Sequence, residues 1–253
     1  MPRVPPWARE KPPAPRTLRR YNLYGWPQPG PGADPGDFPP REAWPPMRVR
    51  VGTSGWAYPH WIGRFYPDDL AQARFLAFHA RRFPTVEVNM TYRRLPGPHV
   101  FDAWRAATPP GFLFAVKAPR TITHDKRLVG AEDDLAGFVD LARRLGDRLG
   151  VLLFQLPPSF ARDLDALDAF LALLPGDVRA AVEVRHRSWH DAEARALLAR
   201  RGVAWVAHDF QRRDAPLWTT AGFAYVRLHG DTGRYRGGYD PAAILAWAEH
   251  LRA

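Results

Sequence analysis

The sequence predicts an α/β fold in which parallel strands alternate with helices, most simply an incomplete TIM-type (β/α) barrel. Short apolar runs alternate with amphipathic segments between residues 49 and 251. The runs are too apolar to face water on one side, which is typical of parallel strands covered by helices. About seven such runs occur without a GxGxxG turn, and this favours a barrel over an open, doubly wound sheet.

The chain is expected to divide at about residue 47. Prolines and glycines interrupt every periodic run in residues 1–47, so this segment predicts a largely disordered leader without a core of its own. Its most regular stretch is 18–24, which could add to a sheet as a strand. Residues 48–253 form the predicted barrel domain.

Within this domain the elements follow in a regular order. Strands are expected at 49–55, 85–89, 112–117, 151–156, 180–184, 204–207 and 223–229. Helices are expected at 70–82, 99–107, 133–149, 164–174, 192–201 and 240–251. Asp240 is the expected N-cap of the last helix, and Pro241 suits its first turn.

Two irregularities of this order concern the end of the barrel. The stretch between the last two expected strands is too short for a crossover helix with its loops. No eighth strand is visible after the last helix. The barrel is therefore open, or residues 18–24 or a partner chain fill the gap.

Composition limits the classes of function. The 253 residues include no cysteine, which excludes disulfides, thiol nucleophiles and Cys-ligated metal sites. No apolar run approaches the roughly 20 residues of a membrane span, so we expect a cytoplasmic protein without a membrane partner. The net charge of +10 favours anionic partners, although an Arg-rich solvated surface would have the same charge.

Polar residues end the apolar runs with a regular parity. Glu183 and Arg185 lie two residues apart, so on a pleated strand they point to the same face. Catalytic residues of (β/α) barrels lie at the carboxyl ends of the strands. We therefore expect one mouth formed by Glu87, Asn89, Lys117, Gln155, Glu183, Arg185, Asp209, Arg227 and His229.

Rare residue types single out some of these positions. Lysine occurs only at residues 11, 117 and 126, and asparagine only at residues 22 and 89, in a chain that otherwise uses arginine as its cation. A lysine is a compact charge whose pKa burial can change, unlike that of arginine. This pattern favours functional roles for Lys117, Lys126 and Asn89.

Several short motifs occur in one order along the domain. They are GTSGW at 52–56, YPHW at 58–61, VEVN at 86–89, FAVK at 114–117, ITHDKRL at 122–128, FQLPP at 154–158, VEVRHRSW at 182–189 and YVRLHG at 225–230. In these motifs the chain resembles the YecE-like family, a bacterial and archaeal domain of unknown function, from about residue 49 to 251. The resemblance implies a TIM barrel similar to apurinic endonuclease IV and sugar isomerase-like barrels. It also implies nucleic acid or sugar phosphates as substrates. The leader is an addition to the family pattern, and the final Phe-Asn-Asn strand of the family is missing.

The mouth suits an enzyme that acts on an anionic, phosphate-bearing substrate by acid/base and electrostatic catalysis. Glu87 or Glu183 is the expected general base and His229 the acid, while Lys117 neutralises developing charge. Arg185 and Arg227 suit phosphate or carboxylate oxygens.

Further substrate-binding residues are expected around this mouth. Two long loops, 118–132 and 230–240, are expected to close over the substrate. The expected contacts in the loops and the motifs are Trp56, Tyr58, His124, Lys126, Arg127, His186, Trp189, Tyr235 and Tyr239. The tryptophans and Tyr58 suit stacking on a base or a sugar, or else pack as the core of their loops.

Three alternatives remain open on the sequence. The charged residues could be structural ion pairs only. Glu87, Glu183, Asp209 and His229 could hold a divalent metal, although the nearby cations oppose this and no cofactor is expected. A basic barrel could also bind nucleic acid without catalysis. The oligomeric state is not indicated.

Overall fold

The computed structural model describes residues 20–21, 27–28, 49–210, 215–230 and 237–251. The chain divides into two compact units, residues 1–49 and 50–253. In the first, β1 (Arg20–Tyr21) pairs antiparallel with β2 (Pro27–Gln28). These strands include two residues of the stretch expected at 18–24, and the rest of that stretch lies outside the described residues.

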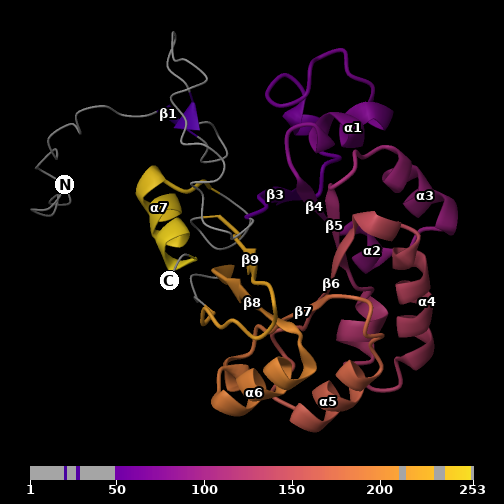
Figure 1. The fold of residues 1–253 in the computed structure, drawn as a ribbon, viewed down its shortest axis with the longest axis vertical. Coiled ribbons are helices and arrows are strands. Elements are labelled where there is room, and N and C mark those ends of the chain that lie inside the picture. Colours follow the sequence, from indigo (N-terminus) through magenta and orange to yellow (C-terminus); the bar gives the residue numbers. More distant parts are fainter. Residues whose placement is uncertain (1–19, 22–26, 29–48, 211–214, 231–236, 252–253) are drawn as a thin grey trace, which may run out of the picture. The chain divides into compact units, whose positions relative to one another are not determined.

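The second unit is built on a parallel sheet of seven strands in sequential order. The strands are β3 (Gly52–Ser54), β4 (Thr85–Val88), β5 (Leu113–Lys117), β6 (Leu149–Gln155), β7 (Ala180–Glu183), β8 (Ala204–His208) and β9 (Tyr225–Arg227). The expected α/β class and the parallel sheet are confirmed. The sheet curls into an incomplete barrel (Figure 1), and among the described residues no further strand follows β9.

Helices follow most of the strands. They are α1 (Phe75–Ala80), α2 (Met90–Arg93), α3 (Pro98–Ala106), α4 (Glu132–Arg143), α5 (Leu164–Ala172), α6 (Ala192–Arg201) and α7 (Pro241–His250). In Figure 1, α3, α4, α5 and α6 lie on the outer side of the curved sheet. As expected, Asp240 caps α7 by accepting a bond from the Ala243 amide, and the described part of the β8–β9 connection has no α-helix.

Some helix boundaries differ from the expectation. The helix expected at 133–149 ends at Arg143, and a 3-10 turn, Gly146–Arg148, in which Gly146 has a φ of 56°, leads into β6 at Leu149. The helix expected at 70–82 is reduced to α1 after a 3-10 turn at Gln72–Arg74. A π-helical turn, Thr121–Asp125, lies in the long loop after β5 and was not expected.

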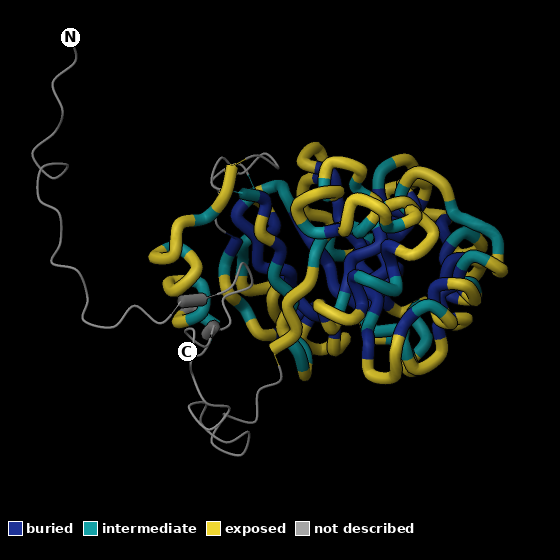
Figure 2. Tube along the Cα trace, turned by 90° about the horizontal axis from the view of Figure 1, so that it is seen from above, coloured by how far each residue is buried: buried dark blue, intermediate teal, exposed yellow. Residues whose placement is uncertain are grey.

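The alternation of side chains along the strands creates two apolar layers. The larger lies between the sheet and the helices and includes Val86, Phe114, Phe154 and Trp205. The smaller lies on the inner face and consists of Ala115, Val151, Leu153, Ala181, Ala204 and Val206. The residues that make up both layers are at most 7% exposed, and Figure 2 shows buried segments along the interior of this unit. The next inner-facing residue of each strand, towards its carboxyl end, is polar, and this positions the candidate site.

Candidate functional site

The inner face of the sheet ends in a layer of buried polar residues. One comes from each of six neighbouring strands: Glu87, Lys117, Gln155, Glu183, His208 and Arg227, none of them more than 8% exposed. They continue the parity of the small inner core, since side chains two residues apart share a face. The structure therefore brings five of the predicted strand-end residues together on one side of the sheet, with His208 in addition.

Arg227 is the centre of this layer. Its Nε and Nη2 donate to Glu87 Oε2 and Oε1 at 2.8 and 2.7 Å, and its Nη1 donates to Glu183. Glu87 lies on β4 and Arg227 on β9, the second and the last strand of the sheet. The bidentate pair therefore joins strands that are far apart in the sheet order, and it shows how strongly the sheet curls.

Glu87 is surrounded by hydrogen-bond donors. Tyr225 donates to Oε2 at 2.9 Å, while Ser54 and Asn89 each donate to Oε1 at 2.9 Å. Burial alone would raise the pKa of Glu87, but the Arg227 guanidinium and these hydrogen bonds outweigh it and lower the pKa. Glu87 is thus held as a carboxylate.

Glu183 has the same character. Its Oε1 accepts from Arg185 Nε at 2.6 Å, and its Oε2 accepts from Arg227. Burial alone would raise its pKa, but Arg227 and Arg185 hold that pKa well below its usual range. Arg185 in turn stacks on Phe210, with 3.7 Å between the guanidinium carbon and the ring centroid.

His229 and Asp209 form a hydrogen-bonded dyad beside the two guanidinium groups. His229 Nδ1 lies 3.1 Å from Asp209 Oδ1, which assigns the ring proton to Nδ1. Its Nε2 lies 3.4 Å from Arg185 Nη2 and 3.5 Å from Arg227 Nη1. Tyr239 donates to Asp209 and accepts from the Gly230 amide at 2.7 Å. Burial lowers the pKa of His229, so the ring is neutral at pH 7.

Lys117 differs from the other buried cations. Its Nζ donates to Gln155 Oε1 at 2.7 Å and lies 4.5 Å from the centroid of the Tyr92 ring. Among the described residues no carboxylate lies within ion-pair distance of this ammonium group. Burial and the charge of Arg227 lower the pKa of Lys117 to about 8.

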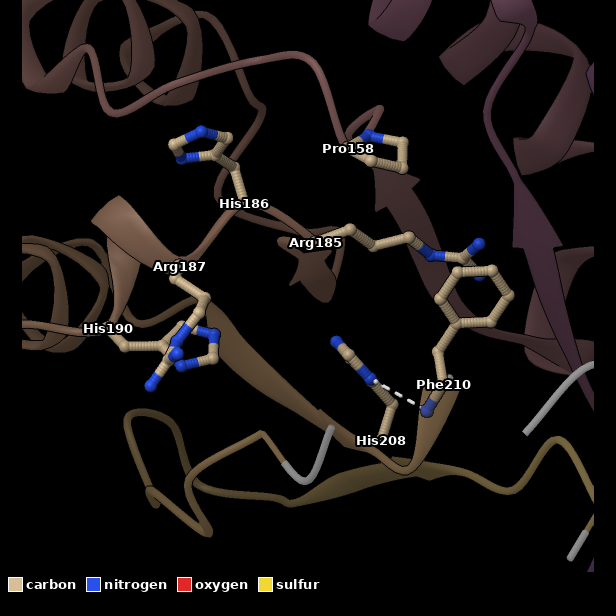
Figure 3. Close-up of a pocket in the computed structure, with 7 residues that line it drawn as sticks. All are labelled: Pro158, Arg185, His186, Arg187, His190, His208 and Phe210. Atoms are coloured by element: carbon tan, nitrogen blue, oxygen red, sulfur yellow. Dashed lines mark hydrogen bonds between the residues drawn. The ribbon is translucent and has the colours of Figure 1, made fainter. Parts of the chain in front are cut away.

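A basic cavity of about 220 Å³ lies at the carboxyl ends of β7 and β8. Figure 3 shows its lining: Pro158, Arg185, His186, Arg187, His190, His208 and Phe210. The lining contains two guanidinium groups and three imidazoles, but no carboxylate. His208 has a fixed role, because its Nε2 bonds to Val184 O at 2.9 Å and its Nδ1 accepts from the Phe210 amide at 3.2 Å.

The other predicted residues lie in different surroundings. His124 packs edge-on against Tyr92, with 5.1 Å between ring centroids, and therefore lies near Lys117. Lys126 is half-exposed and bonds to Asp134 at 2.8 Å and to Gly130 O at 2.7 Å. Arg127 is exposed and contacts Ser159 at 3.4 Å. Lys126 thus contacts its own loop and the first turn of α4, and Arg127 contacts a neighbouring loop.

The aromatic candidates divide between core and rim. Trp189 is fully buried, donates to Phe160 O at 2.8 Å and therefore presents no open ring face to a ligand. Trp56 packs edge-on against Trp104 in the outer core. Tyr58 is half-buried at the rim, where burial and Glu87 raise its pKa. Tyr235 lies outside the described residues.

Several site residues were missed by the sequence analysis. They are His208, Tyr225, Tyr92, Phe210 and Ser54. His208 continues the inner parity of Ala204 and Val206 and could have been found from that pattern. Tyr225 lies two residues before Arg227 on β9, so the same parity could have found it. The other three, Ser54, Tyr92 and Phe210, contact the site from an edge strand, from a helix that was not expected and from a loop, and no pattern in the sequence places them.

The carboxylates do not form a metal site in the described part of the chain. No group of three His, Asp or Glu residues there is arranged to hold a metal ion. The position between Glu87 and Glu183 is taken by the Arg227 guanidinium, a cation that binds both. Glu87 and Glu183, which the sequence analysis considered as metal ligands, therefore bind an arginine side chain.

The family of the chain follows from comparison with known proteins. The profile of the family described as "Protein of unknown function DUF72" matches residues 50–253. The chain belongs to the DUF72 family. The match covers the whole seven-stranded unit, so the expected resemblance to YecE-like proteins is confirmed.

Named members of the DUF72 family are similar over part of their length. The UPF0759 protein YecE of Escherichia coli is 37% identical over 139 residues, which cover 54% of this chain and 48% of that protein. The UPF0759 protein YunF of Bacillus subtilis is 29% identical over 149 residues, 56% of this chain and 52% of that protein. The chain spans about half the length of these curated relatives.

Solved structures of the DUF72 family share the fold. A DUF72 family protein of Thermotoga maritima is 30% identical, with a TM-score of 0.73 over 81% of this chain and 87% of that one. One from Enterococcus faecalis is 17% identical, with a TM-score of 0.60 over 80% of this chain and 84% of that one. In the described part of the chain, no helix is long and apolar enough to cross a membrane.

Proposed function

We propose that this DUF72 protein is an enzyme that binds an anionic, phosphate-bearing substrate at the mouth of a TIM-type barrel and transfers a proton to or from it. His229 is the acid/base group. The observation that carries the proposal is the position of its Nε2 atom, 3.4 and 3.5 Å from the Nη atoms of Arg185 and Arg227. An anion bound by these guanidinium groups would bring its reacting atoms next to the imidazole.

The second partner of His229 supports this role. Asp209 accepts from Nδ1 at 3.1 Å, and it is itself held by Tyr239. A carboxylate behind an imidazole fixes the tautomer and stabilises the imidazolium that forms when Nε2 takes a proton. Because burial lowers the pKa of His229, the ring is neutral near pH 7 and can accept a proton.

The cavity supplies a place for the anion. Three of its lining residues contact His229: Arg185, His208 and Phe210, the last with 5.3 Å between ring centroids. In the central layer, Lys117, Arg185 and Arg227 balance Glu87, Glu183 and Asp209. The cavity adds Arg187 and no carboxylate, so a phosphate group is more stable there than in the balanced centre.

Glu87 and Glu183 take a different role from the one expected of a general base. Both are bound by guanidinium groups that lower their pKa, and a carboxylate of low pKa is a weak base. We assign them to holding Arg185 and Arg227 in place. A preorganised guanidinium stabilises developing negative charge without rearrangement during the reaction.

The metal-dependent alternative has less support, because Arg227 stands between the two glutamates.

An experiment distinguishes an enzyme from a protein that only binds nucleic acid. We would incubate the full chain with sugar phosphates and nucleotides in D₂O, and follow the loss of substrate C–H signals and the formation of products by NMR.

We expect exchange or turnover of at least one phosphate ester. His229→Gln should slow it by about 10²- to 10⁴-fold, the contribution of a positioned acid/base group. The exposed His99 provides a matched control, since His99→Gln removes an imidazole that is not among the site residues. Equal rates for wild type and His229→Gln would contradict the proposal. Salt-dependent nucleic-acid binding without any exchange or turnover would favour the binding protein.

A further inference from the structure

The surroundings of Lys117 suggest more than charge neutralisation. Buried cations in this protein have carboxylate partners where the structure describes them: Arg227 binds Glu87 and Glu183. Lys117 is 8% exposed, and the hydrogen bond of its Nζ goes to a neutral amide oxygen of Gln155. A buried ammonium without a direct counterion is destabilised relative to the neutral amine.

The neighbouring strands explain why no carboxylate reaches Lys117. Gln155 on β6 pairs in register with Glu183 on β7, so the amide stands between the lysine and that carboxylate. Glu183 is bound by Arg185 and Arg227, and Glu87 by Arg227. The guanidinium groups therefore pair with the carboxylates of the layer. The hydrogen-bond partner of Lys117 is the neutral amide of Gln155.

Two further contacts hold the lysine in place. Thr91 donates to the backbone carbonyl of Lys117 at 2.6 Å, and the Tyr92 ring lies 4.5 Å from Nζ. The ring favours the ammonium form. Burial and Arg227 lower the pKa of Lys117 more than Glu183 and Glu87 raise it, and the pKa falls to about 8. At pH 7 the amine is then neutral about 300 times more often than a lysine with the ordinary pKa of 10.5.

We propose that Lys117 is a nucleophile that forms an imine with the carbonyl carbon of an anionic aldehyde or ketone. The inference rests on the proposed function and deepens it, because it names the substrate class of the same site. The anionic group of the substrate binds at the cavity beside Arg185 and Arg187, and the carbonyl group reaches the inner face where the lysine lies.

The step balances without any further reactant. The amine lone pair forms a C–N bond while the carbonyl π electrons move to oxygen, and one proton passes from nitrogen to oxygen to give a carbinolamine. The nitrogen lone pair then forms the C=N bond, and the hydroxyl group leaves as water with the second proton from nitrogen. The imine withdraws electrons from the adjacent carbon, so a C–H bond there becomes acidic enough for His229.

The composition of the chain makes this proposal easy to test. The chain has three lysines, at residues 11, 117 and 126. Lys126 is half-exposed, is paired with Asp134 and has a raised pKa, so it serves as an accessible lysine that is held in its ammonium form. We would incubate the full chain with a carbonyl compound and cyanoborohydride, which reduces an imine to a stable secondary amine, and measure the labelling of each lysine peptide by mass spectrometry.

Three probes separate the chemistry of the anion. They are dihydroxyacetone phosphate, pyruvate and the neutral dihydroxyacetone. We expect an anionic probe to label Lys117 at least about tenfold faster than Lys126. This factor is smaller than the ratio between the fractions of the two lysines that are neutral amines at pH 7. Faster labelling by the phosphate ester assigns a phosphate-bearing substrate, and faster labelling by pyruvate an oxo acid. Inorganic phosphate should slow the labelling, and the rate should rise with pH to a midpoint near 8.

Other results would overturn the inference. They are Lys117 labelling no faster than Lys126, or neutral dihydroxyacetone labelling it as fast as the anionic probes. Lys117→Arg keeps a cation in place and cannot form an imine, and thermal melting shows whether it remains folded. If Lys117 is not labelled while His229-dependent exchange persists, the imine fails and the proposed function stands. If neither occurs, both fail.

Discussion

Replacement of Arg227 by methionine tests the electrostatic organisation of the site. Arg227 donates three hydrogen bonds to two buried carboxylates, two to Glu87 and one to Glu183. Removing one partner of a buried ion pair costs about 3–5 kcal/mol, because the remaining charge stays desolvated. Arg227→Met should therefore lower the free energy of unfolding by about that amount at pH 8. Urea unfolding followed by circular dichroism measures it.

The pH dependence gives the sign of the effect. In the wild type the pKa values of Glu87 and Glu183 are lowered, so their contribution is present above their unfolded pKa and is lost as the pH falls through the folded pKa. Without Arg227, the remaining hydrogen bonds to Glu87 no longer offset the effect of its burial, so the pKa of Glu87 rises. The variant therefore regains stability when this carboxyl group is protonated. The difference between wild type and variant should therefore shrink from pH 8 to pH 5.

Two matched variants sharpen this test. Arg227→Met combined with Glu87→Gln removes one of the buried charges that lose their guanidinium partner, so the double variant should be more stable than Arg227→Met alone. Arg201→Met breaks an exposed pair with Asp168 and should change stability much less. An Arg227→Met protein within about 1 kcal/mol of wild type, or a difference that grows towards acid, would refute the reasoning.

Three further outcomes are expected. Arg187→Ala removes an exposed guanidinium from the cavity lining. It should weaken the binding of a phosphate ester by about 10- to 100-fold, which is the value of a charge-assisted hydrogen bond. Calorimetry beside an Arg200→Ala control measures this effect, and unchanged affinity would place the anion elsewhere. Trp189→Ala should lower the free energy of unfolding by about 3–5 kcal/mol because the ring is fully buried, whereas a small loss together with weaker ligand binding would return this tryptophan to the site. Burial lowers the pKa of His79 from 6.5 to about 4, so its neutral form contributes stability above pH 6.5 that is lost as the pH falls towards 4, about 3 kcal/mol in total. His79→Gln should therefore have a shallower fall in stability over this range by urea unfolding, and a fall as steep as that of wild type would contradict this account.

Much of the site could be predicted because strand periodicity is local. Side chains two residues apart share a face, so Glu87, Lys117, Gln155 and Glu183 were assigned to one mouth from the pattern of each strand alone. The helix boundaries were less predictable, since α4 ends at Arg143 and a 3-10 turn at Gly146–Arg148 stands where the expected helix would continue. Residues such as Tyr92 and Phe210 reach the site from a short helix and from a loop, and their spacing carries no sign of it.

The sequence by itself determined the alternation of strands and helices, the DUF72 motifs and the set of polar residues at the strand ends. Only the tertiary structure decided which charges pair. Glu87 and Arg227 are 140 residues apart in the chain and meet because the sheet curls. That pairing makes the carboxylates poor bases, places a guanidinium between them and leaves Lys117 with an amide partner. Charge, burial and pKa depend on distances through space, and these are set by the closure of the sheet.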